Sequence, residues 1–120
     1  MKLILPVLIA GACLAADSPF ACDRSALSTD ARKHHFDELM PAMRKIVKGV
    51  KEVPAGFAFE LPADSAAIQL AAEWVSNERL CCPFLDIAIR IERERGKVWL
   101  ELTGREGTKE FIRADFARWF

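Results

Sequence analysis

Two adjacent cysteines, Cys81 and Cys82, are the residues whose type and spacing most clearly suggest chemistry. Pro83 follows them directly, and the remaining cysteines are Cys13 and Cys22. Neighbouring residues have Cα atoms about 3.8 Å apart, which is below the usual disulfide range of about 4.4–6.8 Å. A disulfide within the adjacent pair would therefore be strained, and both thiols remain available to Cys22 or to a metal ion.

Two uses of these thiols remain open. In the first, Cys22, Cys81 and Cys82 form a three-thiolate site for a soft ion such as Cu(I), Hg(II), As(III) or Zn(II), with His34 or His35 as additional ligands. In the second, Cys22 forms a disulfide with one cysteine of the pair, giving a non-catalytic interaction module of the disulfide-stapled kind common among small secreted domains. The spacing matches no paired Cys-x-x-Cys zinc signature. We favour the metal site, because adjacent cysteines offer two sulfurs to one ion but only one to a disulfide.

Thiol–disulfide exchange is a third use, and it ranks below the other two. The cysteine pair ends a predicted helix, where the negative end of the helix dipole disfavours a thiolate. A soft cation would reverse this balance, since it deprotonates the thiols that it coordinates. The chain also contains no Ser-His-Asp arrangement and no phosphate-binding loop. We therefore expect a binding protein rather than an enzyme and assign no catalytic residue.

Several polar residues accompany the cysteine pair. Glu78 lies on the apolar side of the same predicted helix, one turn before the second cysteine. A carboxylate among apolar side chains needs a partner or a proton, so Glu78 either tunes a thiol or pairs with Arg79, Lys109 or a backbone donor. We expect the pairing. We also expect His34 and His35 to be solvated helix residues unless they bind the metal.

The N-terminus predicts export to the periplasm or the cell exterior. Lys2 precedes an apolar run that ends in small residues, as in a secretory signal peptide. This run is too short to be a transmembrane span, which needs about 20 apolar residues. We expect residues 1–16 to be removed, leaving residues 17–120 as one domain. A lipid anchor at Cys13 is a less favoured alternative, because Ala10 stands where lipoprotein cleavage boxes usually have leucine.

The charge of the chain excludes some classes of partner. Its 17 basic and 17 acidic side chains leave no net charge, so there is no electrostatic attraction to nucleic acid or to an anionic membrane. The apolar share of 52% is normal for a globular domain. The cysteines instead make a soft metal ion or another thiol the expected partner.

A periodic pattern of apolar residues upstream of the thiols predicts helical structure. Ser28 is a suitable N-cap and Asp30 suits the first turn of the first helix. Apolar residues then recur at three- and four-residue spacing from Phe36 to Val50. Pro41 interrupts this pattern and predicts a kink or a junction between two helices.

The rest of the pattern predicts a sheet. Residues 57–61 alternate as in a half-buried strand, and residues 85–91 and 98–102 form an antiparallel hairpin. Between them lies the helix that ends in the cysteine pair, capped by Asp64 or Ser65. A last helix follows the hairpin. The order α-β-α-β-β-α predicts an α+β fold, with a small antiparallel sheet and helices packed on a face.

Two segments resemble a known family. They are Glu78-Arg79-Leu80-Cys81-Cys82-Pro83-Phe84 and the stretch from Leu102 to Phe111. They are similar to a widespread family of small uncharacterised bacterial proteins with an E-R-x-C-C-P-F motif followed by L-T-G-x-x-G-x-K-E-F. The resemblance covers nearly all of residues 17–120 and includes an upstream cysteine like Cys22, although Arg105 stands where the family usually has proline. It implies the fold and the set of three cysteines, and it implies no activity.

We predict that the mature protein begins near Ala16 or Asp17, because the signal-peptide pattern ends there. Intact-mass spectrometry of the protein from its native host measures this directly. Cytosolic protein that still carries Met1 would contradict both the export prediction and the oxidising environment that it implies.

Overall fold

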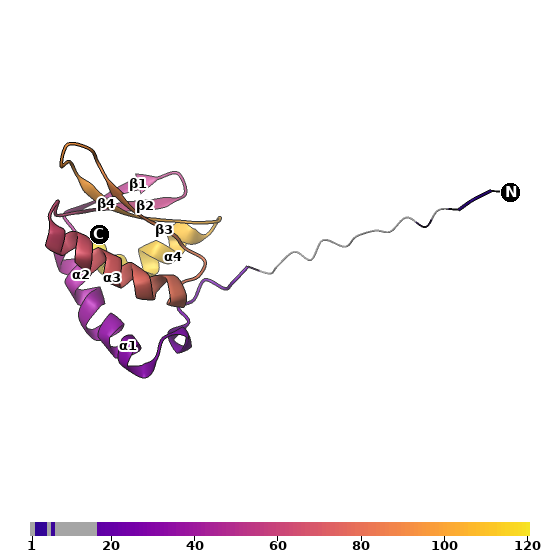
Figure 1. Cartoon of the computed structure of the whole chain (residues 1–120), viewed down its shortest axis with the longest axis horizontal. Coiled ribbons are helices and arrows are strands. Elements are labelled where there is room, and N and C mark those ends of the chain that lie inside the picture. The colour runs from indigo at the N-terminus through magenta and orange to yellow at the C-terminus, as the bar shows by residue number, and fades with distance from the viewer. Residues whose placement is uncertain (1, 5, 7–16) are drawn as a thin grey trace.

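Two antiparallel hairpins build the sheet: β1 (Gly49–Val53) with β2 (Gly56–Leu61), and β3 (Asp86–Ile91) with β4 (Val98–Thr103). Pairing between β2 and β4 joins them, so the strand order is β1-β2-β4-β3. The helices cover one face of this sheet in the computed structural model (Figure 1). The predicted α+β class is therefore confirmed.

The structure describes residues 2–4, 6 and 17–120. Most of the predicted signal peptide, together with Cys13, lies outside the described residues. Among those that are described, no helix is both long enough and apolar enough to cross a membrane.

The first helical region has three parts: α1 (Thr29–His34), a π-helical turn η2 (His35–Leu39) and α2 (Met40–Ile46). Ser28 caps α1 as predicted, since its hydroxyl accepts a hydrogen bond from the Ala31 N–H. The predicted junction at Pro41 is also present, because α2 begins with this proline in its first turn. A π turn is one way for a helix to accommodate a proline, which cannot make the usual hydrogen bond to the preceding turn.

Strand β1 differs from the sequence prediction, in which the helical pattern of apolar residues extended to Val50. The helix ends at Ile46, Val47 takes an extended backbone, and Val50 pairs with Phe59 of β2. β-Branched residues favour strands. Here the neighbouring strand offers Val50 a pairing edge that local periodicity does not reveal.

The longest helix is α3 (Ser65–Cys81), and it positions the cysteine pair. The Asp64 carboxylate caps it by accepting the Ala67 N–H at 2.8 Å. At the other end, the Cys82 N–H still donates to the Glu78 carbonyl at 2.8 Å. Pro83 follows, and a proline disfavours helical backbone in the residue before it. The helix therefore stops with both thiols at its last turn.

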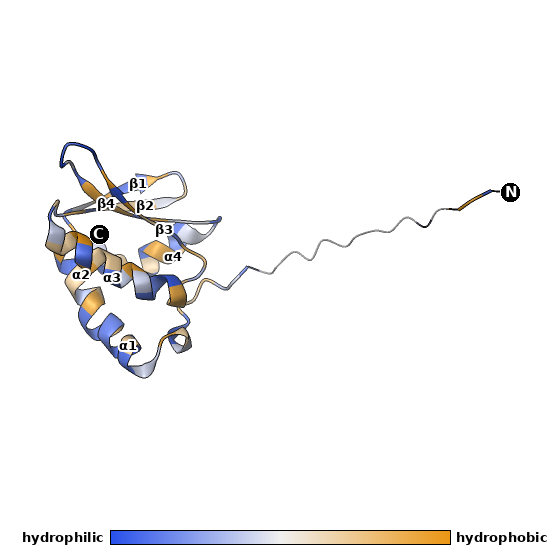
Figure 2. Cartoon of the chain, in the orientation of Figure 1, coloured by the Kyte–Doolittle hydropathy of each residue, from blue (hydrophilic) through white to orange (hydrophobic). Residues whose placement is uncertain are grey.

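Aromatic side chains fill the space between the helices and the sheet. Trp74 of α3 is fully buried, with its ring centroid 5.3 Å from that of Trp119 and 6.1 Å from that of Phe116. Phe116 directly follows α4 (Thr108–Asp115), and Trp119 is the last residue of the short helix η3 (Ala117–Trp119). Each large apolar side chain that is buried, such as Trp74, stabilises the fold by about 1.5–3 kcal/mol. Hydrophilic residues gather instead at the tip of the β3–β4 hairpin and along α1 (Figure 2).

Residues 17–27, which we call the N-terminal strap, lie against the end of α3. Their Phe20 ring packs edge-on against Phe84, with centroids 5.1 Å apart, and stacks near Phe111. The Arg105 guanidinium lies 4.0 Å from the centre of the Phe20 ring and donates a hydrogen bond to the Ser18 carbonyl. The strap is thus held to the domain by its own side chains and backbone.

We predict that Asp64→Ala lowers the free energy of unfolding by about 1 kcal/mol, because it removes the side-chain cap of α3. Urea unfolding followed by far-ultraviolet circular dichroism measures the change. Ser65→Ala is the matched control, since Ser65 is exposed and is not the N-cap. An equal loss in both variants would contradict the capping role.

Candidate metal centre

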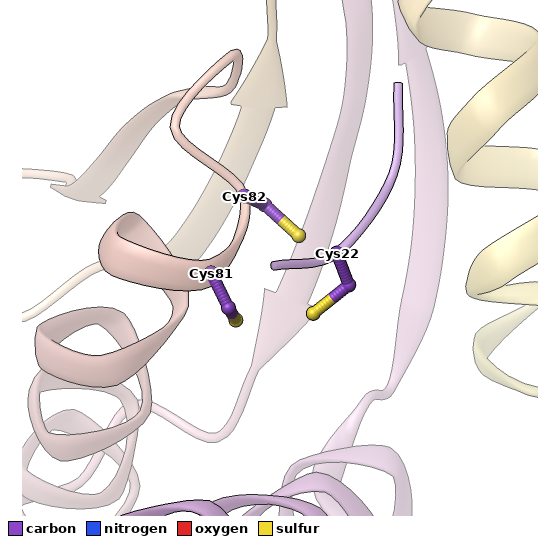
Figure 3. Close-up of side chains that lie close together, drawn as sticks. All are labelled: Cys22, Cys81 and Cys82. Carbon is purple, nitrogen blue, oxygen red and sulfur yellow. The ribbon is translucent and has the colours of Figure 1, made fainter. Parts of the chain in front are cut away.

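Three thiols converge where the N-terminal strap meets the end of α3 (Figure 3). The sulfur atoms of Cys22, Cys81 and Cys82 all lie within 4.8 Å of one another. All three cysteines are free thiols. Both the metal site and the disulfide predicted from the sequence require Cys22 to lie beside the cysteine pair, and it does so, while no disulfide is present among the described cysteines.

The spacing of the sulfurs suits one shared ion. A thiolate binds Zn(II) at about 2.3 Å, so three sulfurs spread evenly around such an ion lie about 4 Å apart. The three sulfurs lie within 4.8 Å of one another, so no pair has to approach by more than about 1 Å to reach that spacing. Small side-chain adjustments are enough to bring all three sulfurs onto one centre.

Backbone hydrogen bonds fix the segments that carry the thiols. The Asp23 N–H donates to the Cys81 carbonyl at 2.7 Å and so ties the strap to the last turn of α3. The Leu85 N–H donates to the Cys82 carbonyl at 3.1 Å and closes the turn after the helix. Cys81 and Cys82 are fully buried, whereas Cys22 is only half-buried. Solvent therefore reaches the cluster through the strap side, at Cys22.

A buried acid–imidazole pair lies beside the sulfurs. The His35 Nε2 and the Glu78 Oε2 are 2.6 Å apart, and both side chains are shielded from solvent. The Cys81 Sγ lies 3.7 Å from the same Glu78 oxygen, so His35, Glu78 and Cys81 form a second group whose donor atoms are within 4.8 Å of one another. The two groups share Cys81.

The partner of Glu78 differs from the one expected. Sequence reasoning paired it with Arg79, Lys109 or the backbone, but Arg79 is exposed and Lys109 forms an ion pair with Glu52 at 3.0 Å. The actual partner is His35. Glu78 pairs with His35 because both are buried, and a carboxylate in the core needs a hydrogen-bond donor that is buried with it.

The two histidines have opposite environments. His34 is half-exposed, hydrogen-bonds to Glu38 and Glu73, and is not brought to the thiols. His35 is fully buried, and the expectation that it is solvated is wrong. A signal was present in the sequence: His35 precedes the buried residues Leu39 and Met43 at intervals of four, which places it on the apolar face of the helix.

The Cys81 thiol ionises more readily than an ordinary cysteine. A hydrogen bond from the Cys82 thiol, helped by one from His35, outweighs burial and lowers the pKa of Cys81 to about 6. The same contact with Cys81, together with burial, strongly raises the pKa of Cys82. Burial, followed by the contact with Cys81, raises the pKa of Cys22 to about 12. At neutral pH the cluster therefore holds one thiolate, on Cys81, solvated by its two neighbours.

His35 carries the balancing charge. Burial lowers its pKa, but hydrogen bonds to Cys81 and Glu78 outweigh burial and raise the pKa to about 9. An imidazolium thus faces both the Cys81 thiolate and the Glu78 carboxylate. These contacts overcome the unfavourable end of the helix dipole, which was the reason for expecting no thiolate at this position.

No protein-family model, curated protein or solved structure matches this chain. The resemblance in the E-R-x-C-C-P-F and L-T-G-x-x-G-x-K-E-F segments therefore stays a prediction.

We predict that the metal-free, reduced protein forms its first thiolate with a pKa of about 6. His35→Gln should move this pKa upward, because the variant removes the cation that faces the thiolate. Ultraviolet thiolate absorbance recorded against pH measures the effect. His34→Gln is the control and should leave the titration unchanged, since His34 lies on the surface. An identical shift in both variants would contradict a specific role for His35.

Proposed function

We propose that this chain is an exported protein that binds one soft, thiophilic metal ion through the thiolates of Cys22, Cys81 and Cys82. The observation that carries the proposal is the convergence of three free sulfurs, within 4.8 Å of one another, from two segments far apart in the sequence. Thiolates are the ligands that soft ions such as Cu(I) and Hg(II) prefer, and Zn(II) also accepts them.

Structural cysteines in a core do not need this arrangement. A buried cysteine behaves as a small apolar residue and makes no demand on its neighbours. Here the cysteines share the interior with His35 and Glu78, and burying such a charged pair is costly unless each member is well paired. The buried charges are placed against the sulfurs, which supports a chemical role for the cluster.

A metal ion uses this thiol set more completely than a disulfide. A disulfide from Cys22 would involve one cysteine of the adjacent pair and leave the other as a buried thiol. One ion engages all three sulfurs. Binding also stabilises the deprotonated state of Cys82 and Cys22, whose thiols otherwise resist ionisation.

His35 and Glu78 act as positioning residues in this proposal. Their donor atoms form a close group with Cys81 alone, so neither joins the three-sulfur group. Contacts of this kind orient a ligand and tune its charge, and their loss typically reduces metal affinity about 10–100-fold.

Export is part of the proposal, and the signal-peptide pattern of residues 1–16 supports it. An oxidising compartment converts exposed thiol pairs into disulfides. Full burial of Cys81 and Cys82 slows that reaction, and a bound ion would prevent it.

We predict that Cys22→Ser, Cys81→Ser and Cys82→Ser each weaken binding of Cu(I), Hg(II) or Zn(II) strongly, because each removes one of three ligands. Anaerobic metal titration of the reduced wild type and the three variants measures the effect. Thermal melts of the metal-free proteins show whether each variant is folded.

A disulfide staple would give a different, asymmetric pattern. In air-oxidised protein, Cys22→Ser and the change at its one partner would each cost about 2–5 kcal/mol of stability, while the third change would cost less. That pattern, or the absence of stoichiometric uptake of any of the three ions by the reduced wild type, would refute the metal-binding proposal.

A further inference from the structure

We propose that the ion for which this site is built is a trivalent metalloid, As(III) or its heavier analogue Sb(III), bound by all three sulfurs. The inference rests on the proposed function and narrows it to one chemical class. Two independent properties of the cluster support it: the number of donor atoms and the net charge that each candidate ion would leave in the buried site.

The donor number is three. The donor atoms of Cys22, Cys81 and Cys82 form a group in which all separations are below 4.8 Å, and no described His, Asp or Glu joins that group as a fourth member. Structural Zn(II) sites are almost always four-coordinate. Trivalent arsenic and antimony instead take three sulfurs in a pyramid and need no fourth ligand. The geometry therefore favours the metalloids over zinc.

The charge of the loaded site separates the remaining candidates. Three thiolates leave a net charge of about −2 with Cu(I), about −1 with Hg(II) and zero with As(III), by simple addition of formal charges. His35 and Glu78 add nothing as long as they share one proton, whichever of them holds it. A net charge in a buried site is costly, so the trivalent ion gives the least costly complex.

Apart from His35, which is paired with Glu78, the described surroundings supply no cation that would offset a negative complex. Both adjacent thiols lie at the C-terminal end of α3, which carries about half a negative charge from the helix dipole. Among the described residues, the lysine and arginine ion pairs involve carboxylates other than Glu78, namely Asp17, Glu52, Glu60, Glu92 and Glu101. Arg24 lies over the Phe36 ring instead, 3.9 Å from its centre.

The binding step is balanced without any oxidant or reductant. Arsenous acid, As(OH)3, reacts with the Cys22 and Cys82 thiols, the Cys81 thiolate and one proton from the solvent. Three As–O and two S–H bonds break, three As–S and three O–H bonds form, and three water molecules leave. Arsenic stays trivalent throughout. The small neutral acid can enter at Cys22, which is the half-buried member of the set.

The test uses the full chain in a Cys13→Ser background, reduced and titrated with sodium arsenite without oxygen. We expect one adduct per chain in intact-mass spectrometry, heavier than the free protein by one arsenic atom and lighter by three hydrogen atoms. X-ray absorption at the arsenic edge should show three sulfur neighbours and no oxygen. An adduct that keeps an As–O bond would overturn the inference.

Cys22→Ser in the same background is the matched variant. It should bind arsenite about tenfold more weakly or worse, because the third As–S bond is lost. It should still bind phenylarsine oxide, which needs only two thiols, and this shows that the variant is folded with its cysteine pair reactive. Unchanged arsenite affinity in Cys22→Ser would overturn the three-sulfur inference.

The failure of the inference is distinguishable from the failure of the proposed function. If the reduced chain takes up Cu(I) or Hg(II) stoichiometrically but does not retain arsenite, soft-metal binding stands and the metalloid inference is wrong. If it takes up none of them, both are wrong.

Discussion

A single backbone hydrogen bond, from the Asp23 N–H to the Cys81 carbonyl, holds together the parts on which the site depends. It joins the N-terminal strap to the last turn of α3 and so sets Cys22 opposite the adjacent thiols. Such a bond contributes only about 1 kcal/mol by itself. Phe20, packed against Phe84 and covered by Arg105, adds the apolar contact that keeps the strap in place. The position of one ligand thus depends on contacts made by residues on either side of it.

The charged cluster is stable for a different reason, which is mutual compensation inside the core. His35, Glu78 and Cys81 would each be costly to bury alone, yet each supplies what the others lack. Trp74 stacks along the His35 ring, with centroids 6.1 Å apart, and excludes water from that side. The His35 Nδ1 has no hydrogen-bond partner among the described residues, so the hydrogen bond of the ring to Glu78 is made through Nε2.

Several features of the fold and the site can be predicted from the sequence, because short-range patterns alone determine them. The caps at Ser28 and Asp64, the hairpin before and after the turn near Gly96, and the burial of Glu78 all follow from short-range patterns. Strand β1 could not be predicted in this way, since its formation depends on the edge that β2 offers. The pairing of Glu78 with His35 was missed for a similar reason: the two residues lie on different helices, and only tertiary packing brings them together.

The placement of Cys22 on the strap also bears on how the protein folds. Cys81 and Cys82 are neighbours in every conformation of the chain, whereas Cys22 lies beside them only where the strap is docked on the last turn of α3. Closing such a long loop carries an entropic cost that grows slowly with its length. An ion that holds all three sulfurs would act as a cross-link between the beginning and the end of this loop, disfavouring the unfolded chain. The cluster is therefore complete only in the finished fold, and a tightly held ion would in turn hold that fold closed.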